Sequence, residues 1–247
     1  MTGNWSSSKV MEWCDSGIVL NAKKFGESSI IAHVMTSEHG RCAGFVNGFN
    51  SKKQRGVIQP GNEVHVCWRA RLEENLGRFA VELIDSHAAR VLLDAGRLSA
   101  VLAACSMVNI CLPEREPYPN LFIEMRNLLT HLPDEGWLTA YVNWEISLLA
   151  ELGFGLDLSH CASTGTSEDL IYVSPKSGRA VSAEAGRPYR ERLLPLPQFL
   201  VGRGKANEDA LLDGLRLTGY FLERHVFSPH GTKLPDPRAT ILQIISD

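Results

Sequence analysis

Three cations lie within four positions of a short stretch near the N-terminus. The stretch N-G-F-N-S-K-K-Q-R-G-V spans residues 47–57 and holds Lys52, Lys53 and Arg55 between two glycines. Glycine lets a backbone approach a ligand without a Cβ clash, and a local excess of positive charge concentrates polyanions. The stretch therefore predicts a basic loop that contacts the phosphates of a nucleic acid. A plain solvated surface loop is the alternative.

The surrounding sequence strengthens this prediction. Residues 39–71 contain six basic residues and a single acid, a local charge of +5, whereas the whole chain carries -3. Phosphate contacts give a sequence-tolerant, salt-sensitive affinity. The candidate DNA-binding residues are Lys52, Lys53, Arg55, Arg41, Lys23, Lys24, Arg69 and Arg71. Three nearby aromatic residues could stack a base or pack in a core, namely Phe45, Phe49 and Trp68.

No constellation for catalysis accompanies the basic stretch. Gly202-Arg203-Gly204-Lys205 lacks the first glycine and the Ser/Thr of a phosphate loop, and no serine stands in a G-x-S-x-G elbow. His160-Cys161 offers two metal ligands, but the next 45 residues hold no other Cys or His. The sequence predicts no enzymatic activity, no cofactor and no metal site.

The cysteines and the hydropathy bound the class of protein. The six cysteines are scattered without a C-x-x-C pair, which favours reduced thiols over disulfides. No run approaches the roughly 18 apolar residues of a membrane span, and the first ten residues lack the apolar region of a signal peptide. We expect a disordered leader over residues 1–11 and a cytoplasmic, nucleoid-associated protein.

Two kinds of periodicity divide the chain. Short β-like runs separated by turn residues fill residues 16–85 and favour a small closed barrel; they are Gly17–Lys24, Ser28–Thr36, Arg41–Asn47, Glu63–Leu72 and Arg78–Ile84. Apolar residues at helical spacing follow, over about 98–112, 121–129, 138–152, 208–227 and 238–245. The stretch between the third and fourth of these helices, about 155–198, loses this period and predicts a β-like insertion.

Longer stretches resemble the RecO family of bacterial recombination and repair mediators. They are D-S-G-I-V-L-N-A-K-K-F-G-E-S-S-I-I-A-H-V-M-T-S-E-H-G-R, F-V-N-G-F-N-S-K-K-Q-R-G-V-I-Q-P-G-N-E-V, W-E-I-S-L-L-A-E-L-G-F-G-L-D-L-S-H-C and Y-V-S-P-K-S-G-R-A-V-S. The resemblance covers nearly the whole chain from about Met11. It implies an α+β protein with an N-terminal OB-fold barrel over 12–86 and a helical domain over 87–247, interrupted by a zinc-ribbon-like insertion.

The resemblance also implies partners. RecO-like proteins bind single- and double-stranded DNA, anneal complementary strands and act with RecR to place RecA on single strands coated by SSB, whose acidic C-terminal tail they contact. One departure concerns metal. Many members hold zinc with four cysteines in the insertion, whereas this chain has Cys161 there and Thr164 where a second cysteine would stand. We therefore expect the insertion to fold without metal.

Other functions remain open from the residues alone. An RNA-binding OB protein would prefer RNA to DNA of the same sequence. An adaptor that recognises an acidic peptide would bind such a tail and leave DNA unbound at low salt. A metal-dependent hydrolase is disfavoured by the missing ligands and acids.

Overall fold

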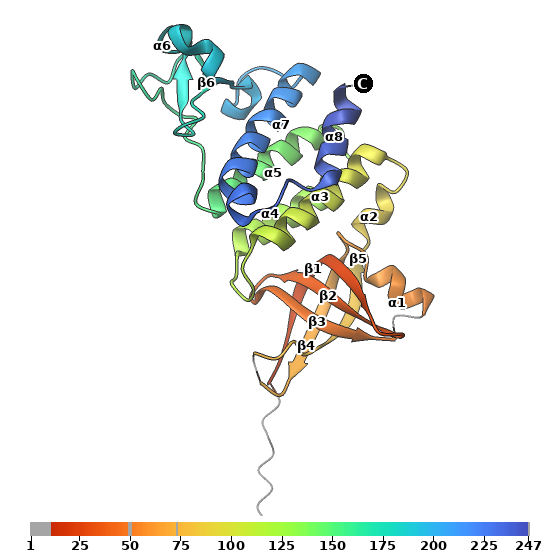
Figure 1. Ribbon diagram of the computed structural model, residues 1–247. Coiled ribbons are helices and arrows are strands. Elements are labelled where there is room, and N and C mark those ends of the chain that lie inside the picture. Colours follow the sequence, from red (N-terminus) through yellow and green to blue (C-terminus); the bar gives the residue numbers. More distant parts are fainter. Residues whose placement is uncertain (1–10, 49–50, 73, 247) are drawn as a thin grey trace, which may run out of the picture. The chain divides into compact units, whose positions relative to one another are not determined.

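The computed structural model describes residues 11–48, 51–72 and 74–246 (Figure 1). The chain forms two compact units. The first comprises the described residues up to Leu92 together with Ala104–Leu129, and the second comprises Leu93–Ala103 and the residues from Thr130 onward. None of the described helices is both long and apolar enough to cross a bilayer.

Five strands close into a barrel in the first unit, as the strands drawn in red to yellow in Figure 1 show. They are β1 (Met11–Phe25), β2 (Ser29–Thr36), β3 (Gly40–Asn47), β4 (Glu63–Ala70) and β5 (Arg78–Asp85). Their order round the barrel is β1-β2-β3-β5-β4. Alternate residues of β4 point inward, among them Val64, Val66 and Trp68, as the period of two in the sequence predicts. The predicted OB-like barrel is confirmed.

Strand β1 has two neighbours along its length. Its first half, from Met11 to Ile18, pairs with β4, and its second half, from Gly17 to Phe25, pairs with β2. The ring closes through a parallel contact between Phe45 of β3 and Arg78 of β5. Residues 1–10 of the expected leader lie outside the described residues, and Met11 already belongs to β1.

The basic stretch is a short helix, so its prediction as a loop was wrong. Helix α1 spans Lys52–Val57, and the hydroxyl of its N-cap Ser51 accepts a hydrogen bond from the Gln54 amide at 3.1 Å. Lys-Lys-Gln-Arg are good helix formers, and the serine cap supplies the missing acceptor at the first turn. At the other end of the helix Val57 and Ile58 are buried in the barrel core.

Three helices follow the barrel, namely α2 (His87–Arg90), α3 (Ala95–Cys111) and α4 (Pro119–His131). The part of the first unit that follows Ala104 is fastened to β3. Arg41 Nε donates to the Leu112 carbonyl at 2.9 Å, and the Arg115 amide donates to the Arg41 carbonyl, also at 2.9 Å. The loop between α3 and α4 therefore belongs to the barrel unit, and a domain division at residue 87 remains a proposal.

The second unit is helical with a small sheet. Its longer helices are α5 (Trp137–Glu151), α7 (Glu208–Leu222), which continues as a π-helical turn over Glu223–Phe227, and α8 (Asp236–Ser246). The sheet has β6 (Leu170–Val173) between β7 (Ala180–Ser182) and β8 (Leu194–Pro195). Short helical segments complete it, namely α6 (Ala183–Gly186), Arg187–Arg192, Gln198–Val201 and Ser228–His230. The predicted α+β architecture with a β-like insertion is confirmed.

A buried ion pair joins three helices of the second unit. Arg238 of α8 is 2% exposed and donates from Nε to Glu145 Oε1 of α5 at 2.7 Å. The Thr218 hydroxyl of α7 donates to Glu145 Oε2 at 2.5 Å. Each charged group thus has a partner in the interior, and removing either one would leave an unpaired buried charge.

The cysteines differ from their prediction. Cys14 and Cys67 form a disulfide, 53 residues apart in the sequence, so the expectation of reduced thiols was wrong for this pair. The two residues are register partners on β1 and β4, with Cα atoms 4.0 Å apart. The remaining described cysteines are free thiols, and Cys161 is buried as expected, beside an exposed His160.

Candidate nucleic-acid interface

Helix α1 presents the predicted cations at one end of the barrel. Lys52 and Arg55 are exposed, and the side chain of Lys53 lies outside the described residues. The amide of Asn62, directly before β4, donates to the carbonyls of Gly56 and Val57 at 2.9 and 3.0 Å. Because Asn62 is fully buried, these bonds fix the helix to the barrel. The cations therefore project from a rigid element.

The strand register brings a second group of residues together at the turn between β1 and β2 and at the end of β3. Phe25 of β1 is the partner of Ser29 on β2, and Ser29 is the partner of Asn47, which ends β3. Lys23 and Lys24 are exposed directly before Phe25. The Phe25 ring, 54% exposed, lies 5.1 Å from that of Phe45 between centroids. Proteins that bind single-stranded nucleic acids combine exposed aromatic rings, which stack on bases, with cations, which contact phosphates.

Arg78 is a candidate that the sequence analysis missed. It is exposed at the start of β5 and is the register partner of Phe45 across the barrel closure. Its outward position follows from the alternation with buried Phe79, but its neighbourhood depends on a parallel contact between distant strands. We name Lys23, Lys24, Phe25, Phe45 and Arg78 the strand-end patch.

Arg69 and Arg71 lie at the opposite end of β4 from α1, and Arg69 is the register partner of Arg78 in the strand-end patch. Six strand residues, or about 20 Å, separate Arg69 from the start of β4, where Asn62 holds α1. The Arg69 guanidinium also donates to both carboxylate oxygens of Glu12, at 2.9 and 2.8 Å. Arg71 is exposed just past the end of β4. The structure therefore does not group these two arginines with α1.

Arg41 is engaged in holding the barrel unit together. Its side chain is 13% exposed and bonds the Leu112 carbonyl. Its guanidinium also lies 3.4 Å from the Glu114 carboxylate. A phosphate contact would have to compete with these partners, and a DNA contact at Arg41 stays a prediction.

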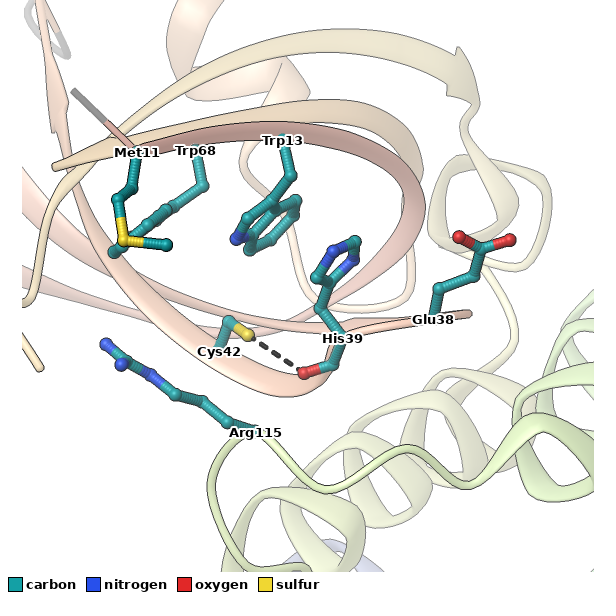
Figure 2. Close-up of a pocket in the computed structure, with 7 residues that line it drawn as sticks. All are labelled: Met11, Trp13, Glu38, His39, Cys42, Trp68 and Arg115. Atoms are coloured by element: carbon teal, nitrogen blue, oxygen red, sulfur yellow. Dashed lines mark hydrogen bonds between the residues drawn. The ribbon is translucent and has the colours of Figure 1, made fainter. Parts of the chain in front are cut away.

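An aromatic pocket of about 290 Å³ opens on the barrel (Figure 2); its lining residues are Met11, Trp13, Glu38, His39, Cys42, Trp68 and Arg115. The Trp13 ring stacks on His39 at 4.0 Å between centroids, with 7° between the planes. The guanidinium of Arg115 lies 5.5 Å from the Trp68 ring centre. Trp68 itself is buried and donates from Nε1 to the Leu76 carbonyl. It therefore belongs both to the wall of the pocket and to the barrel core.

Hydrogen bonds set the electrostatics beside this pocket. Burial works to raise the pKa of the Asp15 carboxyl, but hydrogen bonds from the Ser37 hydroxyl, the Glu38 amide and the His39 ring lower it overall. Burial raises the pKa of the Cys42 thiol to about 11, so that thiol is neutral at pH 7. The pocket thus has an aromatic wall, a fixed carboxylate behind His39 and a guanidinium at Arg115, a lining that suits a planar ring.

Two of the three aromatics proposed to stack bases now have a position. Phe45 belongs to the strand-end patch, and Trp68 lies in the core as the alternation on β4 indicated. Phe49 lies outside the described residues.

Comparisons with known proteins agree along the chain. Residues 11–87 match the family model for Recombination protein O N terminal, and residues 92–234 match that for Recombination protein O C terminal. The DNA repair protein RecO of Rhodospirillum centenum is 49% identical over 230 residues, 92% of each chain. That of Methylocella silvestris is 47% identical over 235 residues, 94% of this chain and 95% of its own. The chain belongs to the RecO family of DNA repair and recombination mediators, which are not enzymes.

Proposed function

We propose that this RecO-family chain binds single- and double-stranded DNA through α1 and the strand-end patch of the barrel. The observation that carries the proposal is the exposure of Lys52 and Arg55 on a helix fixed by Asn62. Cations on a rigid element bind phosphates without a large loss of conformational entropy. The exposed Phe25 ring adds a stacking surface for unpaired bases.

Annealing follows from the same charges. Two complementary strands repel each other, and cations between them reduce that repulsion, so the strands meet more often. No covalent step is required, in keeping with a family of mediators. In the cell, we propose, the chain acts in the cytoplasm at the nucleoid, with RecR, to place RecA on single strands coated by SSB, contacting the acidic SSB tail.

We assign a second DNA contact to the aromatic pocket. Trp13 is half-buried and lies between the rings of His39 and Trp68, with centroids 4.0 and 5.8 Å from its own (Figure 2). An entering base would therefore stack on the part of this group of rings that the pocket leaves uncovered. An unpaired base in the pocket would also meet the Arg115 side chain, which lies near Trp68 on a separate segment (Figure 2). A base in a duplex is already stacked and paired, so this contact favours single strands.

The annealing rate of two complementary DNA oligonucleotides, bare and SSB-coated, tests the main proposal. The variant K52A/K53A/R55A should lose the acceleration, and the slope of log affinity against log salt should fall by somewhat less than 1 for each phosphate contact removed. The matched control is R187A/R190A/R192A, which removes the same charge from an exposed segment of the second unit.

Two results would refute the assignment of DNA binding to α1. Equal losses in both variants would mean that net charge alone decides binding, and an unchanged salt slope in the α1 variant would place the DNA elsewhere. Preference for RNA of the same sequence would favour the RNA-binding alternative. Binding of an acidic peptide without DNA binding at low salt would favour the adaptor.

A further inference from the structure

Three soft donor side chains meet on the outer face of the barrel wall between β1 and β4. Cys14 stands directly opposite Cys67 in the register, and His65 lies two residues before Cys67 on the same strand. Because side chains of a strand alternate between faces, residues 65 and 67 point to the same side. His65 and Cys14 are exposed and Cys67 is half-buried, so this group is open to solvent.

The spacing of the donor atoms suits a metal ion. The two sulfur atoms and a ring nitrogen of His65 all lie within 4.8 Å of one another. His65 Nε2 is 3.7 Å from Cys67 Sγ. In a tetrahedral zinc site with bonds of about 2.0–2.3 Å, neighbouring nitrogen and sulfur ligands are about 3.5 Å apart. Reduction of the disulfide would let the two sulfurs separate to a similar distance without moving the strands.

The ligand types select the ion. Two thiolates and one imidazole prefer a thiophilic d¹⁰ ion such as Zn²⁺ over Mg²⁺ or Ca²⁺. Within the described residues, this is the one group of three or more Cys, His, Asp or Glu side chains arranged to hold a metal. It is distant in sequence from Cys161, the residue that prompted the question of zinc in the insertion.

We propose that the reduced chain binds one Zn²⁺ ion through Cys14 Sγ, Cys67 Sγ and His65 Nε2, with solvent in the fourth position. The disulfide and the metal site are alternative states of the same two cysteines. An external dithiol supplies two electrons and two protons to the sulfur–sulfur bond, yielding two thiols and its own cyclic disulfide. Binding of the metal then releases the two thiol protons to solvent. The inference does not depend on the proposed DNA contacts.

Cobalt titration of the full chain tests this site. Protein reduced with dithiothreitol and freed of it under anaerobic conditions is titrated with Co²⁺, and the sulfur-to-cobalt charge-transfer absorbance is followed and then displaced by Zn²⁺. The wild type should bind one ion per chain, and the oxidised protein should show no such band. His65→Ala should keep the band with at least about tenfold weaker affinity, and Cys14→Ser or Cys67→Ser should reduce it. Cys161→Ser is the matched control and should titrate like the wild type.

A second measurement keeps the inference testable if a variant fails to fold. In the reduced wild type, Zn²⁺ should protect Cys14 and Cys67 from alkylation, as located by mass spectrometry of peptides, and leave the labelling of Cys111 unchanged. No band in the reduced wild type, or a band lost in Cys161→Ser and kept in Cys14→Ser, would overturn the proposal. So would alkylation of Cys14 and Cys67 at the same rate with and without Zn²⁺.

Discussion

Asp15 is a charged residue at an inward-facing position of the barrel. Its carboxylate accepts hydrogen bonds from the amides of Ser16 and Glu38 at 2.7 and 2.8 Å and from the Ser37 hydroxyl, and its other contact is the His39 ring at 3.1 Å. These bonds fix the β2–β3 turn, which presents His39 to the aromatic pocket. The carboxylate therefore supports the pocket without lining it.

Replacing Asp15 with Asn should reduce the free energy of unfolding by about 1–3 kcal/mol at pH 7. The folded-state pKa of Asp15 lies below its ordinary 3.8, so its stabilisation is present above pH 3.8 and is lost as pH falls through the folded value. Urea unfolding of both proteins at pH 7 and pH 3 should show the difference shrinking at pH 3. Asp157→Asn, at an exposed carboxylate, is the control with a smaller effect; a pH-independent difference would contradict the role of charge.

Trp13 is the residue whose loss tests the pocket. Trp13→Ala should weaken binding to single-stranded DNA by about 1–3 kcal/mol, the stacking contribution of one base, and should affect duplex binding less. Fluorescence anisotropy with labelled oligonucleotides measures both affinities. Trp13→Phe should restore most of the loss because it keeps a ring, and Phe154→Ala removes an exposed ring from the second unit as a control. Unchanged single-strand affinity in Trp13→Ala would remove the pocket from the interface.

At the scale of elements, Gly40, the first residue of β3, packs against the loop after α3. Its φ is +67°, and a Cβ at this position would collide with the backbone of Glu116. Gly26 has a similar φ of +69°, but a Cβ there would meet no other atom within 4 Å. Substitution of Gly26 therefore tests backbone strain alone, whereas substitution of Gly40 tests backbone strain together with a steric clash.

Gly26→Ala should cost about 1–2 kcal/mol through its left-handed backbone alone. Gly40→Ala should cost clearly more, because the Glu116 backbone has to move. Chemical denaturation of both variants gives the comparison, and equal costs would show that the loop accommodates the methyl group without loss.

The ion pair between Glu145 and Arg238 connects α5 to α8. Glu145→Ala should destabilise the chain by about 3–5 kcal/mol, because Arg238 would remain buried without its partner. Thermal or urea unfolding measures the loss. The double variant E145L/R238M removes both charges and should recover much of the stability; no recovery would show that the lost packing, and not the unpaired charge, sets the cost.

At the scale of the whole molecule, periodicity predicted the architecture because burial follows it closely. The inward residues of β4 and the apolar stripe of α5 are both readable from the sequence. The first half of β1 was missed because Asp15 occupies an inward position and interrupts the alternation. Helix α1 was missed because two glycines flank a run of four helix-forming residues.

The candidate interface was only partly predictable for a related reason. A cluster of cations in the sequence, such as Lys52 and Arg55, stays a cluster in the fold. Arg78, Arg41 and the cysteine pair depend on partners that lie far away in the sequence. Arg41 is engaged by Leu112, and Cys14 is opposite Cys67 only through the register of β1 and β4. Charge density is a local property, whereas strand register and loop docking are not.

The two partners of β1 also set an order of events during synthesis. The second half of β1 can pair with β2 soon after both leave the ribosome, since a short turn joins them. The first half can complete its pairing with β4 only after Ala70, the partner of Met11, has been synthesised. At about 5–20 residues per second, the ribosome needs roughly 3–12 s to produce that partner. For those seconds the nascent chain carries an open strand edge with Trp13 and an unpaired Cys14, the interval in which a chaperone would have to shield it from neighbouring chains.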